Sequence, residues 1–75
     1  MNQHIQINPR ICNGKPVIAG TRIPVTVILD QMVETGSIDN IIDLYPELSR
    51  EQVAGALRYC HDVINHTELE LTAAA

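Results

Sequence analysis

Apolar residues recur at helical spacing through most of the chain after residue 24. Three groups repeat at three- and four-residue intervals: Val25, Ile28, Leu29, Met32 and Val33; Ile38, Ile41, Ile42 and Tyr45; and Val53, Leu57, Cys60 and Ile64. Each group lies on one face of an α-helix. Pro24 suits the first turn of the first helix, and Gly36 suits its C-terminal end. The pattern predicts three amphipathic helices.

The start of the third helix is marked by two independent signals. Ser49 and Gln52 have the spacing of a capping box, in which each side chain bonds the backbone amide of the other residue. Leu48 and Val53 flank this box as a hydrophobic staple. We therefore expect the third helix to begin directly after Ser49.

The second and third helices together form a predicted helix-turn-helix. Ser37 is the expected N-cap of the second helix, and Pro46 ends that helix because the residue before a proline avoids the α region. In a DNA-binding unit of this kind, the third helix would present Arg50, Gln52 and Arg58 to a groove. A three-helix core that uses the same turn without binding DNA is the open alternative.

The first third of the chain reads as an irregular arm that contains strands. Alternation over residues 1–8 places Ile5 and Ile7 on one face of a short, half-buried strand. Asn13-Gly14 suits a tight turn, so a hairpin with the following segment is expected. Pro16 has no amide donor and confines that segment to an edge.

The third helix is longer than a small core requires. Its apolar repeat extends through Thr67 to Leu71, which suggests a seam for a second copy or a frayed tail. We assign residues 1–66 to a single domain and residues 67–75 to a flexible or partner-bound tail. Gly55 weakens this helix by about 1 kcal/mol relative to alanine, so either another helix approaches closely there or the glycine is merely tolerated.

Composition favours an aliphatic core and a partner. The 75 residues include two tyrosines as the only aromatics, so Ile, Leu and Val must form the core. A domain of this size is marginally stable alone, and we expect a homodimer. The net charge of −4 divides unevenly: residues 1–29 carry three basic and no acidic residues, whereas residues 30–75 carry two basic and nine acidic ones. A basic arm suits contact with nucleic acid or an acidic partner, although solvated surface charge is an equal alternative.

Candidate chemistry is sparse. His61 and His66 are five residues apart and do not share a helical face. Cys12 and Cys60 form no CxxC pair and are expected to be reduced. No metal-ligand, nucleotide-binding or catalytic motif occurs. We expect a soluble, cytoplasmic protein with no enzyme activity, no cofactor and no association with a membrane.

Two segments carry a resemblance to a known family: GKPVIAGTRIPV at residues 14–25, and YPELSREQVAGAL at residues 45–57. Over about residues 5–65 the chain resembles the small bacterial family called domain of unknown function 433. The resemblance implies a mainly α fold: a winged or homeodomain-like three-helix helix-turn-helix core with a short N-terminal strand or hairpin arm. In many members the family role is that of an antitoxin in a type II toxin-antitoxin module, which neutralises a PIN-like ribonuclease toxin. Repression of its own operon, by binding operator DNA through the helix-turn-helix, is a further possible role that we consider.

The resemblance also suggests where such a toxin would bind. PIN-like toxins hold metal in a carboxylate cluster, with which Arg10 or Arg22 of the arm would pair. Lys15 and Thr21 belong to the same expected contact surface. Local turn chemistry does not by itself account for the Gly-Thr-Arg-Ile segment, so we expect Thr21 and Arg22 to fix the arm against the helices or a partner.

Other assignments of these residues remain open. Arg22 can instead pair with Asp30 or Asp39 of its own domain. The toxin-binding stretch can instead be the tail, through Leu69 and Leu71. The function itself has two alternatives, a stand-alone DNA-binding transcription regulator and a purely structural dimerisation module.

Overall fold

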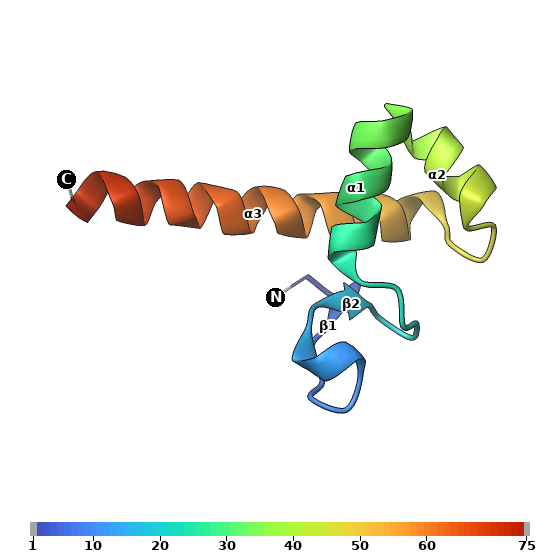
Figure 1. Cartoon of the computed structure of the whole chain (residues 1–75), viewed down its shortest axis with the longest axis horizontal. Helices are drawn as coiled ribbons and strands as arrows, with labels where there is room; N and C mark the ends of the chain where they lie inside the picture. The colour runs from blue at the N-terminus through green and yellow to red at the C-terminus, as the bar shows by residue number, and fades with distance from the viewer. Residues whose placement is uncertain (1, 75) are drawn as a thin grey trace.

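The computed structural model describes residues 2–74, with side chains for residues 2–67. Two short strands, β1 (Ile5–Gln6) and β2 (Val17–Ile18), precede three helices, α1 (Val25–Thr35), α2 (Ile38–Leu44) and α3 (Arg50–Ala74). In Figure 1, α1 crosses α3, the strands lie below the N-terminal end of α1, and α3 continues far beyond the crossing. The predicted fold class, a mainly helical domain with an N-terminal hairpin arm, is confirmed.

The helix ends lie where the capping residues predicted them. Ser37 Oγ accepts a bond from Asn40 N (3.1 Å) at the start of α2. Ser49 and Gln52 complete the capping box of α3 with two bonds, from Ser49 N to Gln52 Oε1 (2.7 Å) and from Gln52 N to Ser49 Oγ (3.1 Å). Gly36 closes α1 in the left-handed conformation, at a φ of 77°. The caps therefore fix both short connections between the helices.

One aliphatic core joins the strands to the helices. Its buried residues are Ile5, Ile18, Val25, Ile28, Ile41, Leu48, Val53 and Ala56. Leu48 is buried in the turn before α3, together with Val53, as the predicted hydrophobic staple requires. The core therefore contains no aromatic side chain among its fully buried members, in agreement with the composition.

The arm pairs as a hairpin, but its strands are shorter and its loop wider than the sequence suggested. Ile5 pairs with Ile18, and Gln6 pairs with Val17, in antiparallel register. Ile7 is 47 % exposed, so the prediction that it shares a buried face with Ile5 is wrong; the strand ends before Ile7. Residues 12–14 form a 3-10 turn with positive φ at each residue, in place of a two-residue hairpin turn.

The segment that leads into α1 runs along the other side of β2. Ile18 N donates to Ile23 O (3.0 Å), and Val25 N donates to Pro16 O (2.9 Å). Val17 and Pro24 form a single antiparallel bridge between these bonds. Backbone contacts therefore flank β2 on both sides and attach the arm to the first turn of α1.

Gly55 is approached by the arm and not by another helix. A Cβ atom at Gly55 would lie 2.7–2.9 Å from three atoms of the His4 side chain. Asn2 Nδ2 also donates to Gly55 O (2.7 Å). Both earlier interpretations of this glycine, a helix contact and a merely tolerated residue, are therefore wrong, because the residues before β1 pack directly on α3.

Beyond its crossing with α1, α3 extends away from the core. All residues from 61 to 67 are exposed, including Val63 and Ile64 at 46 % and 52 %. The Cα radius of gyration is 13.3 Å, whereas a compact domain of this length has a radius of about 11 Å. The extension of α3 explains this excess, since a 25-residue helix is about 37 Å long.

Candidate functional site

The Gly20-Thr21-Arg22 segment forms a tight turn between β2 and α1. Gly20 has a φ of 79°, and its amide donates to Gln6 Oε1 (3.3 Å). Thr21 Oγ1 donates to Ile18 O (2.7 Å) and accepts from Ile23 N (3.0 Å). Thr21 thus fixes the turn itself, since both of its side-chain bonds remain within residues 18–23.

The turn presents Arg22 to solvent. The Arg22 side chain is exposed, while its carbonyl accepts a bond from Cys12 Sγ (3.4 Å). Arg10 and Lys15 are exposed on the same arm. Among residues 2–67, none of these three cations forms an ion pair. The arm therefore displays positive charge that its own domain does not neutralise by direct contact.

The expected pairing of Arg22 with Asp30 or Asp39 is not formed. Asp39 instead lies 2.8 Å from Arg50, in an exposed ion pair that joins α2 to the first turn of α3. This pair takes up one of the three residues that the sequence assigned to DNA contact. Because both partners are solvated, it stabilises the fold by about 0–1 kcal/mol.

The other two expected DNA contacts differ in availability. Gln52 is half-buried, and its side-chain oxygen Oε1 already accepts a hydrogen bond from Ser49 N in the cap of α3. Arg58 is exposed and borders a shallow hollow that also contains Glu51, Asp62 and His4. Two carboxylates thus lie near the free arginine, so the start of α3 does not form a uniformly basic surface.

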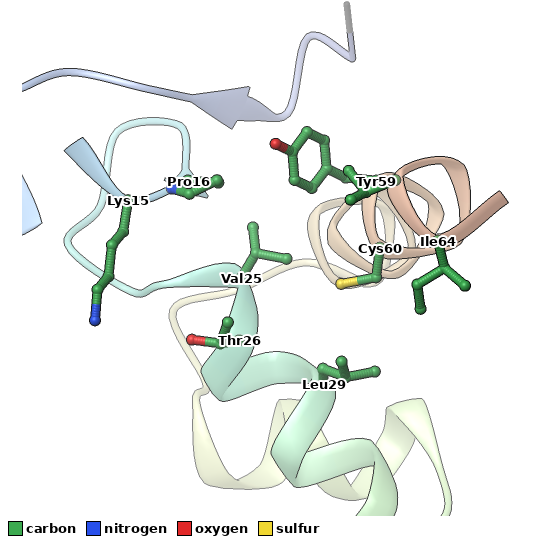
Figure 2. A pocket seen from close by; sticks show the side chains of 9 residues that line it. Lys15, Pro16, Val25, Thr26, Leu29, Tyr59, Cys60 and Ile64 are labelled. Carbon is green, nitrogen blue, oxygen red and sulfur yellow. The ribbon is translucent and has the colours of Figure 1, made fainter. Parts of the chain in front are cut away.

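The helices also form an apolar groove that the sequence analysis did not identify. Figure 2 shows α1 and α3 as its two walls, with the arm at one side. The groove measures about 420 Å³ and is lined by Lys15, Pro16, Val25, Thr26, Leu29, Tyr59, Cys60, Val63 and Ile64. Lys15 supplies the only charged side chain in this lining. The sequence does contain one indication of this groove, the adjacent apolar pair Val63-Ile64. Neighbouring residues point to different faces of a helix, so both side chains cannot pack against the core.

Cys60 lies part-way down this groove. Partial burial raises the pKa of its thiol above the ordinary 9.0. Cys12 and Cys60 are both free thiols. The thiol of Cys60 is therefore protonated at neutral pH and contributes a small apolar surface to the groove.

The part of the chain with described side chains offers few other features for chemistry. No group of three His, Cys, Asp or Glu residues there lies close enough to hold a metal ion. No helix within the same part is both long and apolar enough to cross a membrane. The leucines of the expected tail contact, Leu69 and Leu71, lie outside the residues whose side chains are described.

Comparisons with known proteins agree with this arrangement of arm and helices. The family model described as protein of unknown function (DUF433) matches residues 5–60. The crystal structure of a DUF433 member protein from Anabaena variabilis is 28 % identical, with a TM-score of 0.74 over 92 % of this chain and 68 % of that one. A search of the curated proteins finds no match. The match covers the arm, the capped turn and the first half of α3, and on this basis the chain belongs to the DUF433 family.

Proposed function

We propose that this chain is an antitoxin, a non-catalytic protein that binds and neutralises a PIN-like ribonuclease in the bacterial cytoplasm. The observation that carries the proposal is the set of three exposed arm cations, Arg10, Lys15 and Arg22, none of which pairs with a carboxylate among residues 2–67. A ribonuclease of this type has a carboxylate cluster in its active site, as the family resemblance implies. Opposite charge on a small, firmly folded arm suits insertion into such a site.

Arg22 is the residue best placed to make this contact. The bonds of Thr21 and the glycine at position 20 fix the backbone on either side of it, so little backbone entropy is lost on binding. A guanidinium can bind a carboxylate through two parallel hydrogen bonds, which a lysine ammonium cannot do. Arg22 would therefore provide orientation as well as charge.

Charge reversal of Arg22 tests this contact. The product of the adjacent gene, as the candidate ribonuclease, is co-purified with the wild-type protein and with Arg22→Glu. Removing one partner of a desolvated charge pair costs about 2–5 kcal/mol, so we expect affinity to fall by at least about 30-fold. Arg58→Glu is the matched control, since Arg58 is an exposed arginine that belongs to α3 and not to the arm.

Three results would remove the proposal. The first is the absence of any complex between the wild-type chain and the ribonuclease, together with no rescue of growth on co-expression. The second is equal loss of binding in Arg22→Glu and Arg58→Glu, which would reflect net charge and not the arm. The third is loss of the folded circular dichroism signal in Arg22→Lys, because the exposed side chain would then have a structural role.

Operator binding with autorepression is the second candidate, and the two-helix unit around the capped turn favours it. α2 ends at Leu44 and α3 begins at Arg50, so residues 45–49 connect them, which is close to the three- to four-residue turn of a helix-turn-helix. Arg58 is exposed on α3, and a homodimer would supply two such units. Fluorescence anisotropy on the promoter duplex should show affinity that falls steeply with salt and falls further in Arg58→Ala.

Equal affinity for random duplex would exclude operator binding. A chain that binds neither ribonuclease nor DNA would be a structural dimerisation module.

A further inference from the structure

The groove between α1 and α3 continues onto the extended part of α3. We call residues 61–74 the α3 overhang. Residues 61–67 of the overhang are exposed, and Val63 and Ile64 belong both to the overhang and to the groove lining. Leu29 on the opposite wall is also exposed, at 36 %. The molecule thus has one continuous apolar surface that its own core does not cover.

The shape of this surface fits a helix. Tyr59 and Val63 are four residues apart on α3, as are Cys60 and Ile64, so these residues form two adjacent rows along the helix. Rows of side chains at this spacing interdigitate with those of a second helix. A helix lying along α3 would cover the groove and the overhang together, whereas an occupant confined to the groove would leave much of the overhang exposed.

The distribution of charge along the chain indicates which helix would bind in the groove. Beyond Cys60 the sequence contains Asp62, Glu68 and Glu70 and no lysine or arginine, whereas residues 1–29 contain three basic and no acidic residues. Lys15 lies on the groove lining and forms no ion pair among residues 2–67. We propose that the groove is a self-association surface, occupied by the α3 overhang of a second copy of this chain.

A two-fold arrangement satisfies both copies at once. Each copy supplies a groove with Lys15 in its lining and an acidic, apolar overhang, so the same contact is made twice across the symmetry axis. Lys15 belongs to both proposed surfaces, but Arg22 is absent from the groove lining and Ile64 is not on the arm. Variants of Arg22 and of Ile64 therefore test ribonuclease binding and self-association separately, and either proposal can fail without the other.

The oligomeric state of single variants tests this surface. Light scattering after size-exclusion chromatography should give the full wild-type chain twice the 8.3 kDa monomer mass. Ile64→Glu places a charge in the groove and should weaken self-association by about 30-fold or more. Leu44→Glu is the matched control, because Leu44 has a similar exposure, 56 % against 52 %, but lies on α2 outside the groove. It should remain a dimer.

A second measurement uses Cys60 in the wild-type chain. Iodoacetamide should alkylate Cys60 more slowly as the protein concentration rises, since the second copy covers it, while Cys12 on the arm should react at a constant rate. Ile64→Glu should abolish the concentration dependence. The proposal is overturned by a monomeric wild type, by a dimer that survives Ile64→Glu, or by concentration-independent alkylation of Cys60.

Discussion

Thr21 shows how one side chain sets the geometry of the arm. Its hydroxyl is both a donor to Ile18 O and an acceptor from Ile23 N, so it closes the turn from two directions. The geometry of this turn then determines the direction in which the Arg22 side chain projects. Thr21 can therefore influence how Arg22 would meet the proposed partner.

Replacing Thr21 by valine should weaken both the fold and partner binding. The change keeps the shape but leaves the half-buried Ile23 amide without its acceptor, which should lower the free energy of unfolding by about 1–2 kcal/mol. Thr21→Ser keeps the hydroxyl and should recover most of this loss. Urea unfolding of both variants measures the difference, and an unchanged midpoint in Thr21→Val would show that the turn does not depend on the hydroxyl.

The choice of glycine at position 55 is explained by a close contact with His4, a residue 51 positions earlier. Alanine at this position would gain about 1 kcal/mol of helix propensity. However, its Cβ would lie 2.7 Å from His4 Cδ2 and 2.8 Å from His4 Cβ. Overpacking of this kind costs about 1–3 kcal/mol, so we expect Gly55→Ala to destabilise the protein or displace the arm.

The same substitution should reverse its effect when the His4 side chain is removed. In a His4→Gly background, the three atoms nearest to a Cβ at Gly55 are absent, so Gly55→Ala should raise the free energy of unfolding by up to about 1 kcal/mol. Thermal unfolding of the four proteins in this double-mutant cycle separates the two contributions. Stabilisation by Gly55→Ala in the wild-type background would refute the contact.

At the scale of elements, the cap of α3 holds the turn between α2 and α3. Ser49→Ala removes the acceptor of the Gln52 amide and should cost about 1 kcal/mol of stability. Ser49→Asp keeps an acceptor and should retain most of it, since an acidic group is also favourable near a helix N-terminus. Hydrogen exchange at the Gln52 amide reports the bond directly. Equal protection in both variants would show that the reciprocal Gln52 bond suffices.

The elements that the sequence predicted correctly are those specified by neighbouring residues. Ser37, Gly36 and the capping box act over three or four positions, so the helix ends that they set can be predicted from neighbouring residues alone. The errors arose where distant segments meet. The contact of His4 with Gly55 and the exposure of Ile7 depend on how the arm packs on α3, which no local pattern contains.

The candidate site was predictable to a smaller extent for the same reason. The charge division predicted that the arm is a contact surface, but it did not show that Asp39 pairs with Arg50 or that Arg22 is exposed without an ion pair. The groove depends on the crossing of α1 and α3, which the helical repeats alone do not specify. Composition predicted a partner, whereas the position of the groove that we propose as the partner surface required the structure.

At the scale of the whole molecule, both charge and shape favour association of two copies of the chain. The basic arm and the acidic overhang belong to one chain with a net charge of −4. Two copies with such a net charge repel each other at long range, so association requires local attraction that exceeds this repulsion. In the proposed dimer, Lys15 would lie against the acidic overhang of the second copy and supply that attraction, and apolar burial in the groove would add to it.

This balance predicts how salt should act on the dimer. Salt screens exposed charges over about 10 Å at 0.1 M, and it should weaken the contact between Lys15 and the overhang of the second copy. The dissociation constant of the wild-type dimer, measured by analytical ultracentrifugation, should therefore rise between low salt and 0.5 M NaCl. Lys15→Gln should flatten this dependence, whereas Arg58→Gln, which removes a charge outside the groove, should preserve it. A dissociation constant that falls with salt in the wild type would mean that repulsion between the two acidic bodies dominates and that the groove is held by apolar contact alone.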